Sequence, residues 1–297
     1  MFHPGELLAQ QKAGYGEVRA AVYDAMPTQH REFFAGLNTF YLSAVDDAGF
    51  PVAMMLQGPP GLLHCVDGNL LEISLAAVSA APLLPLLQRG VAVGGLGIDF
   101  SNRRRNRVNG VVAAVNEESI SIRVVESFGN CPQYIQRRDL PAVNPWKAAV
   151  EVEPLTGLDA DARYLIAATD TFFVASHASR QAGAGGVDIS HRGGLPGFIE
   201  LRQGKLHIPD YRGNRYMNTL GNLLLEPRCA LLLLDFHQGA ALHIQGRAEI
   251  DWQPVEEGLT ERYWQVDIDR VTRLRQLFPP AGLKVEFADS SLTAGRQ

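Results

Sequence analysis

The spacing of apolar and polar positions predicts a chain built mostly from short antiparallel strands. Thr39–Val45 is rich in β-forming residues and ends at an Asp-Asp-Ala-Gly turn, so Pro51–Gln57 is expected to return as the second strand of a hairpin. Residues 119–124 and 264–269 alternate apolar and polar side chains, as strands with one buried face do. Residues 4–37 instead predict two helices joined by a turn. We therefore expect a mainly β (α+β) fold with helices at its margins.

The second half of the chain repeats this order of elements. Thr171–His177 predicts a strand like the one that contains Phe40, and the turns GPPG and GLPG follow in the two halves. The separation from Gly61 to Gly110 and that from Gly197 to Gly246 are both 49 residues, so residue n matches residue n + 136. This register pairs Asp99 and Phe100 with Asp235 and Phe236. Ordered self-similarity of this kind predicts a duplicated domain, each copy being a small β unit that closes its sheet into a barrel.

The expected domains follow from the repeat. Residues 1–140 would form the first copy with its N-terminal helices, residues 141–158 a Pro-containing linker, and residues 159–297 the second copy, which carries the main polar cluster. Short helices are also expected at residues 81–88 and 159–168, and a turn at residues 182–186.

Composition narrows the classes of function. Hydrophobic residues make up 46% and charged residues 20% of the chain, as in an ordinary folded protein with a substantial core. The net charge is -5, because 27 Lys and Arg are outnumbered by 32 Asp and Glu, and the only dense basic run is residues 103–107. These values predict no nucleic-acid partner.

The cysteines and the N-terminal residues indicate in which cellular compartment the protein is expected. The three cysteines are far apart and odd in number, which favours a reducing compartment and predicts neither a disulfide framework nor a metal site. The N-terminal residues lack the pattern of a secretory signal, and no apolar run has membrane-spanning length. We therefore expect a cytoplasmic protein with no membrane and no metal.

Residues 188–222 hold the densest candidate chemistry. Gly-rich turns are followed by polar and basic side chains where a strand should lead into a helix: Asp210, Arg212, Asn214, Arg215, Asn218 and Asn222. Backbone N–H groups at a helix N-terminus favour phosphate, and Arg adds a bidentate partner. This pattern predicts an anion site. The alternative is a solvated loop before a capped helix.

The two copies differ at this cluster. The offset of 136 places Ser74, Ala76, Val78, Ser79 and Pro82 opposite the polar residues, so the first copy lacks the cluster. The first copy instead carries the basic run at 103–107 and the segment SFGNCPQYIQRR, in which Pro132 predicts a short helix with Asn130 or Cys131 as its cap. Cys131 could then be a reactive thiol, although such a cysteine more often simply packs. The basic run is most simply a solvated hairpin, and contact with an anion is the alternative. Each copy therefore carries polar residues that the other lacks, and we expect the two sets to form one composite site between the copies.

At these residues the chain resembles the pyridoxamine 5'-phosphate oxidase-like flavoproteins, the FMN-binding split β-barrel superfamily. HRGGLPGF, IPDYRGNRYMNTLGN and IQGRAEI resemble consecutive signatures of one uncharacterised branch of that superfamily, and SFGNCPQYIQRR resembles its Cys-containing motif. The resemblance covers nearly the whole chain. It implies two tandem split β-barrels with flanking helices. Because members commonly dimerise around FMN, it also implies that the chain is its own pseudo-dimer.

The resemblance further implies which residues contact FMN. The phosphate would lie near Arg212, Asn214 and Arg215. The other expected contacts are Ser190, His191, Arg192, Asp210 and Asn218 from the second copy and Arg105, Asn130, Cys131 and Gln133 from the first. Residues 285–297 do not match the basic substrate-binding tail of pyridoxamine phosphate oxidase, so vitamin B6 oxidation is not expected.

These expectations lead to one principal hypothesis and two alternatives. The principal hypothesis is an FMN-dependent oxidoreductase acting on a small-molecule substrate, with a partner reductase or NAD(P)H as electron donor and no covalent nucleophile. The alternatives are a module that binds flavin, haem or another cofactor without turnover, and a scaffold with an eroded site. Dimerisation of the chain through exposed barrel surfaces stays open.

Overall fold

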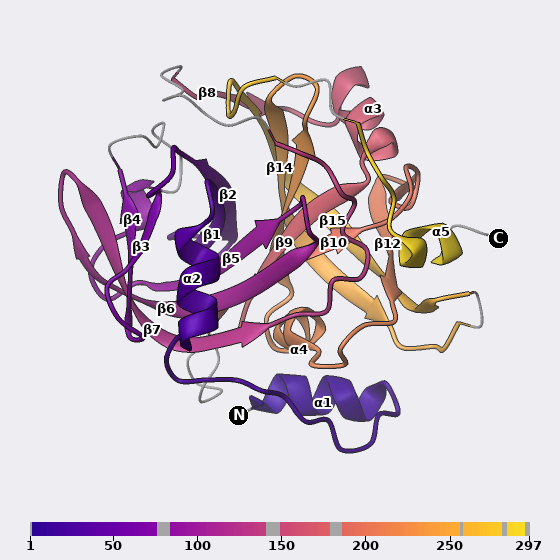
Figure 1. The fold of residues 1–297 in the computed structure, drawn as a ribbon. Coiled ribbons are helices and arrows are strands. Elements are labelled where there is room, and N and C mark those ends of the chain that lie inside the picture. Colours follow the sequence, from indigo (N-terminus) through magenta and orange to yellow (C-terminus); the bar gives the residue numbers. More distant parts are fainter. Residues whose placement is uncertain are drawn as a thin grey trace.

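A computed structural model describes residues 2–75, 84–140, 149–178, 186–255, 258–280 and 284–294. The chain is mostly β, as predicted, and forms two antiparallel sheets that stand side by side (Figure 1). The first sheet has seven strands, in the spatial order β2 (Pro51–Gln57), β1 (Thr39–Val45), β5 (Ala92–Asp99), β6 (Arg104–Val115), β7 (Ser119–Gly129), β4 (Leu70–Ser74) and β3 (Leu63–Cys65).

The second sheet repeats this order strand for strand. It runs β10 (Val187–Gly193), β9 (Thr171–His177), β13 (Arg228–Asp235), β14 (Ala240–Asp251), β15 (Thr260–Arg275), β12 (Lys205–Tyr211) and β11 (Glu200–Arg202), with β8 (Glu151–Leu155) added beside β15. Strands β2, β5 and β6 have the same bounds as β10, β13 and β14 after a shift of 136 residues. Register shifts precede Gly110 and Gly246, one in each copy. The duplication read from the sequence is therefore present in the fold, as two tandem split-barrel-like units whose sheets are not closed.

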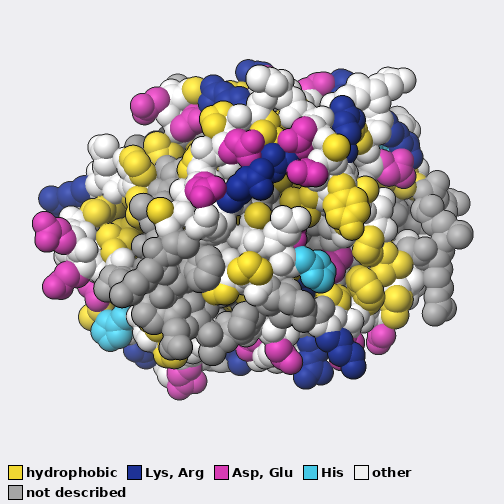
Figure 2. All heavy atoms as spheres, turned by 90° about the horizontal axis from the view of Figure 1, so that it is seen from above, with side chains coloured by type: hydrophobic (Ala, Val, Ile, Leu, Met, Phe, Trp, Pro, Cys, Tyr) yellow, Lys and Arg dark blue, Asp and Glu magenta, His cyan; other side chains and the backbone are white. Residues whose placement is uncertain are grey.

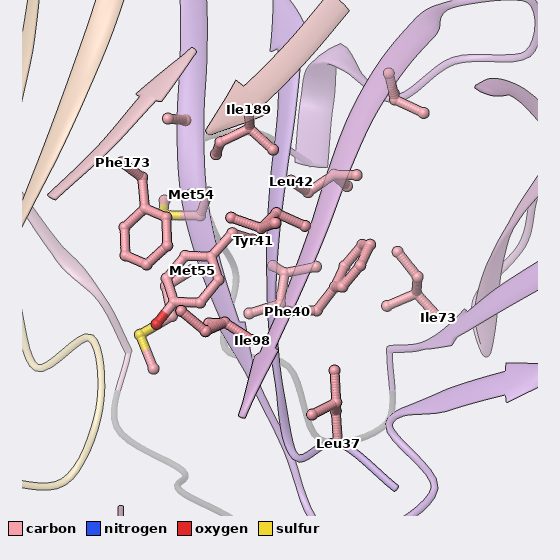
Figure 3. Close-up of a cluster of buried hydrophobic side chains, with 14 of the residues drawn as sticks. Leu37, Phe40, Tyr41, Leu42, Met54, Met55, Ile73, Ile98, Phe173 and Ile189 are labelled. Carbon is pink, nitrogen blue, oxygen red and sulfur yellow. The ribbon is translucent and has the colours of Figure 1, made fainter. Parts of the chain in front are cut away.

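Equivalent residues of the two copies touch each other, which locates a pseudo-two-fold axis. Tyr41 of β1 and Phe173 of β9 occupy the same position in their strands, and their rings stack with centroids 3.6 Å apart (Figure 3). Phe100 and Phe236, matched by the offset of 136, meet edge to face at 6.0 Å. A residue can contact its own counterpart only near the symmetry axis, so the chain is arranged as a pseudo-dimer of its two halves.

The two copies share one hydrophobic core across this axis. The larger buried cluster joins Phe40, Leu42 and Leu96 of the first copy to Phe173, Ile189 and Leu232 of the second. Around Tyr41, the apolar side chains of Met54, Met55 and Ile98 converge on Phe173 and Ile189 (Figure 3). Burial of this kind supplies roughly 25 cal/mol per Å² of apolar surface, so the interface resembles the interior of one domain.

Each end of the chain contacts the copy to which it does not belong. The helices are α1 (Pro4–Lys12), α2 (Thr28–Ala35), α3 (Ala160–Ala168), α4 (Asn218–Leu225) and α5 (Asp289–Ala294), with a 3₁₀ turn η1 at Leu84–Leu86. Helix α1 packs against α4 of the second copy, below the sheets in Figure 1. At the other end of the chain, Arg137 of the first copy forms a β-bridge with Glu286. The N-terminal helix thus lies on the half that carries the polar cluster.

Two local helix predictions differ from the structure, and the expected linker contains an added strand. Residues 130–138 form no helix; the segment is extended, with Tyr134 at φ 63°. Its backbone runs against Gly193, where a Cβ atom would collide with the Tyr134 carbonyl oxygen, so tertiary contact overrides the local helix signals. The expected linker contains a strand, β8, that pairs with β15. The helix predicted at 81–88 is only the short turn η1 where it is described. Residues 76–83, 141–148 and 179–185, and with them much of the expected turn at 182–186, lie outside the described residues.

Two further observations concern membrane-spanning helices and surface charge. Among the described residues, no helix is long and apolar enough to cross a membrane. On the face drawn in Figure 2, acidic and basic side chains are interspersed and do not gather into a continuous basic patch.

Candidate functional site

Two adjoining hollows lie between the copies at the C-terminal ends of β10 and β12. The first, about 70 Å³, is lined by Arg105, Asn130, Cys131 and Gln133 of one copy and by His191, Arg192 and Asn214 of the other. The second, about 60 Å³, extends from Arg192 and Asp210 to Arg215, Asn218 and the first turn of α4. Both are lined by Arg107, Arg192, Tyr211, Gly213 and Asn214. We call the two hollows together the interface groove.

Two arginines of β6 carry positive charge into the groove. Arg107 is 6% exposed, and its guanidinium contacts Ser190 Oγ and lies 3.5 Å from Asp188. Arg105 forms no ion pair with any described residue, and its Nη1 lies 3.0 Å from His191 Nδ1. Burial and then the charges of Arg107 and Arg192 lower the pKa of Arg105 to about 9, so it remains a cation at neutral pH.

Polar atoms around the groove lack partners. Five buried atoms form no hydrogen bond with any described residue: Nε of Arg105, Arg107 and Arg192, Nε2 of His191 and Oδ1 of Asn130. Burial and the charge of Arg105 hold the pKa of His191 well below its usual value, so the ring is neutral. Because its Nδ1 faces the Arg105 donor, Nε2 carries the proton. Four residues that line the groove therefore each carry a nitrogen donor without a described partner. Leaving such groups buried and unpaired costs about 1–3 kcal/mol each.

The N-terminus of α4 adds backbone donors to the same place. Met217 precedes the helix in a left-handed conformation, φ 63°, and provides no side-chain cap. Thr219 and Leu220 of the first turn line the groove together with Arg215, which is exposed at its mouth. The first N–H groups of an uncapped helix attract anions, so this end of the groove favours a phosphate.

Asp210 partly neutralises the positive charge of the groove. It is 6% exposed and lies 3.6 Å from Arg192 and 3.4 Å from Arg262. Burial raises the pKa of its carboxyl, and the two arginines oppose that shift. Since Arg262 is nearly buried on the far side of Asp210, Asp210 is shared between two cations and leaves Arg192 only partly neutralised.

Most of the residues expected at the site do lie together. Ten of them line the groove: Arg105, Asn130, Cys131, Gln133, His191, Arg192, Asp210, Asn214, Arg215 and Asn218. Two do not. Ser190 is buried behind the groove between Arg107 and Thr219. Arg212 is exposed and pairs with Glu261 at 3.5 Å. With no helix at 130–138, the helix-start argument for a reactive Cys131 no longer applies.

Sequence reasoning missed the aromatic wall of the groove. Tyr134 and Tyr211 stack with centroids 5.1 Å apart, and Tyr211 also stacks on Phe198 at 6.5 Å. The Tyr134 hydroxyl donates to the carbonyl of Arg212 at 2.8 Å and so ties the first copy to the loop before α4. The signal was present, since Tyr134 and Tyr211 lie within the two motifs already identified, but their pairing is a tertiary contact.

At the pseudo-symmetric position on the other side of the axis, the described residues do not form a comparable set of polar side chains. There, Met54, Met55 and Leu56 stand where the second copy has Ser190, His191 and Arg192, and all three are buried. His243 and Gln245 replace Arg107 and Asn109. His243 Nε2 accepts from the Ala53 N–H at 3.1 Å, and Gln245 donates to the Pro51 carbonyl at 2.9 Å. Within the described part of the chain, the polar set of the groove is therefore present on one side of the axis; residues 76–83, which match residues 212–219, lie outside the described residues.

Comparison with known proteins gave only distant structural likenesses. No family model matches the chain, and no curated protein matches it significantly. A single-residue variant of HupZ from Group A Streptococcus is 12% identical and covers 39% of this chain and 98% of its own, with a TM-score of 0.31.

Two further solved structures match at a similar level. A putative pyridoxamine 5'-phosphate oxidase from Lactobacillus delbrueckii is 17% identical over 36% of this chain and 95% of its own, with a TM-score of 0.29. A FAD-binding protein from Mesorhizobium loti is 13% identical over 43% of this chain and 99% of its own, also with a TM-score of 0.29. At such scores the likenesses carry no weight for function.

Proposed function

We propose that the chain binds FMN in the interface groove and acts as an FMN-dependent oxidoreductase. One observation carries the proposal: Arg105, Arg107, Arg192 and His191 line one groove, and each has a buried nitrogen donor without a hydrogen-bond partner among the described residues. An anionic, oxygen-rich ligand would satisfy them, and the phosphate and ribityl chain of FMN have that chemistry.

The residues divide the binding between them. Arg192, Arg215 and the first turn of α4 would hold the phosphate, because they combine two guanidinium groups with free helix N–H groups. Arg105 and the protonated Nε2 of neutral His191 would donate to uncharged oxygens of the cofactor. Tyr134, Tyr211 and Phe198 offer a flat apolar wall. Each hollow is smaller than FMN, so the cofactor would extend beyond them.

When bound, the isoalloxazine ring would accept and donate the hydride or electrons. The chain's own residues would bind, orient and tune it, and no side chain of the groove need act as a nucleophile. A small-molecule substrate and either NAD(P)H or a partner reductase would complete the reaction.

The FMN affinities of two variants test whether the groove binds the cofactor. Arg192→Ala should weaken FMN binding about tenfold or more, because a hydrogen bond to a charged group contributes about 1.5–3 kcal/mol. Arg212→Ala is the matched control, since Arg212 is exposed, pairs with Glu261 and does not itself line the groove. Equal FMN affinity in the two variants would contradict the assignment.

Turnover separates the proposed enzyme from a binding module. FMN-loaded protein is mixed with NADH or NADPH without oxygen, and the flavin absorption is followed before and after an acceptor is added. Bleaching followed by recovery supports an oxidoreductase. Stable flavin absorption with both donors and with dithionite-reduced ferredoxin as a protein donor favours a module that only binds the cofactor.

A further inference from the structure

A larger cavity, of about 510 Å³, lies beside the interface groove. Its walls come from β5, β6 and β7 of the first copy and from the start of β10. The N-terminal residues up to Glu6 of α1, the segment 20–22 and the residues at the start of α4 line the rest of it. Asn218 lines both this cavity and the groove. Valine side chains form much of the wall, at positions 22, 93, 111, 125 and 187. The cavity is large enough for a small organic molecule.

Three carboxyl groups face this cavity. Glu6 and Asp188 are each 5% exposed, and Glu126 is half-buried. Asp188 accepts from Asn109 and Asn222, each at 2.8 Å. Glu6 accepts from the His3 N–H at 2.8 Å and from the Asn218 side chain. Among the described residues, Glu126 has one weak hydrogen-bond contact, 3.4 Å from Asn109 Nδ2, and so keeps acceptor capacity.

Positive charge offsets these carboxyls only in part: burial and the charge of Asp188 raise the pKa of Glu126, the N-terminal amine and Arg107 lower it, and the net shift is upward. Among the described residues, Arg107 is the one basic side chain in ion-pair range of any of the three, 3.5 Å from Asp188, apart from His3 beside Glu6. Burial lowers the pKa of His3, so it is neutral near pH 7. Burial and repulsion from Asp188 raise the pKa of Glu6 to about 7 and also raise that of Glu126. A bound cation would relieve this repulsion.

Aromatic rings and an unpaired acceptor complete the lining. Phe2 and Tyr216 meet edge to face with centroids 5.8 Å apart, and Tyr216 lies 6.3 Å from Phe128. All three line the cavity. Asn109, 7% exposed, also lines it. Its Nδ2 donates to Asp188, and its Oδ1 has no hydrogen-bond partner among the described residues. Aromatic faces with nearby carboxylates are the combination that binds organic ammonium groups.

We propose that this cavity binds an organic cation, a protonated amine or quaternary ammonium group attached to an apolar or aromatic body. A metal ion does not fit, because no group of His, Cys, Asp and Glu in the described part of the chain is arranged to hold one. A phosphate or carboxylate ligand would be repelled by Glu6, Glu126 and Asp188. The inference goes beyond flavin binding and holds whether or not the groove takes FMN.

Titration calorimetry with charge-matched probes tests the proposal. Phenethylammonium and phenyltrimethylammonium are titrated into the full chain, and phenylacetate serves as the anion of similar shape. At least one of the two cations should bind, and phenylacetate should not. Failure of both cations, or equal binding of phenylacetate, would overturn the proposal.

A pair of variants locates the binding. Glu126→Gln should weaken cation binding about tenfold, and Glu117→Gln, an exposed position next to the same strand, should leave it unchanged. Equal effects of the two substitutions would place the cation elsewhere and overturn the proposal.

The same titration with and without FMN separates this site from the proposed flavin site. Cation binding that persists at saturating FMN supports a distinct cavity. Competition between the two would make the cavity part of the flavin site and overturn the proposal. If the chain takes up no FMN and still binds the cation, flavin binding fails and the cation site stands.

Discussion

Single residues decide on which side of the pseudo-two-fold axis polar side chains remain available to a ligand. Arg107 and Asn109 of β6 match His243 and Gln245 of β14, and both pairs reach across to the neighbouring copy. Arg107 and Asn109 meet buried polar groups, Ser190 and Asp188, whereas the other pair bonds to backbone atoms of β2. A long cation beside polar partners leaves donors for a ligand. A short side chain bonded to the backbone closes the interface.

The pKa of Glu6 predicts a pH-dependent stability at the residue scale. Its folded pKa of about 7 lies above the ordinary 4.5, so the folded state holds a proton that the unfolded state releases between these values. Stability from this group is therefore present at low pH and is lost as pH rises through 7. Gln can replace Glu in the capping box that Glu6 forms with His3. Between pH 5 and pH 8, Glu6→Gln should gain about 2 kcal/mol relative to the unsubstituted chain.

Urea unfolding at the two pH values measures this difference. Glu117→Gln, which is exposed, should show no change relative to the unsubstituted chain. If Glu6→Gln also follows the unsubstituted chain at both pH values, Glu6 titrates normally and the account of its burial is wrong.

At the scale of elements, the contact of α1 with α4 holds the N-terminal helix over the second copy. Gly221 of α4 lies against Glu6, where a Cβ atom would stand 2.6 Å from Glu6 Cα and 2.7 Å from its backbone N. These are backbone atoms and cannot move aside without moving α1. Since Phe2, His3 and Glu6 line the cavity, the position of α1 also shapes that cavity.

Gly221→Ala should therefore destabilise the protein, although Ala is the better helix former by about 1 kcal/mol. The collision should outweigh that gain and give a net loss of about 1–2 kcal/mol, with faster proteolytic removal of the N-terminal residues. Gly16→Ala is the control, because nothing lies within 4 Å of a Cβ atom there. A Gly221→Ala protein as stable as the control variant would show that α1 does not pack on α4.

Elements set by local pattern could be predicted from the sequence, and those set by distant contacts could not. The hairpin β1–β2, helix α3 and the register of 136 residues follow from alternation, turns and spacing. Residues 130–138 carry local helix signals, yet close approach to Gly193 keeps them extended. Likewise, Arg212 and Arg215 have the same side chain in the same motif, but of the two only Arg215 lines the groove, while Arg212 is exposed and pairs with Glu261.

At the scale of the whole molecule, the shared core makes the two copies one cooperative unit. Tyr41 and Phe173 are fully buried and stacked on the axis. Arg138 of the first copy lies 4.1 Å over the ring of Phe236 and bonds to Asp170 of the second at 2.6 Å. Because these contacts join the copies at the centre of the core, neither copy can lose them and remain intact.

Tyr41→Ala should lower the free energy of unfolding by about 3–5 kcal/mol, as loss of a buried aromatic ring does. Its effect should reach the second copy, where the buried Trp264 reports by fluorescence. Far-UV circular dichroism and tryptophan fluorescence should show one coincident transition before and after the substitution. Separate transitions would mean that the copies unfold independently.

The number of FMN molecules bound per chain tests the central claim most directly. The purified protein is saturated with FMN and freed of excess, its absorption spectrum is recorded, and the flavin released by heat is identified and counted against protein. A single site on one side of the axis predicts one FMN per chain. Two per chain would contradict the one-sided site, and a colourless protein that takes up no added FMN would contradict flavin binding altogether.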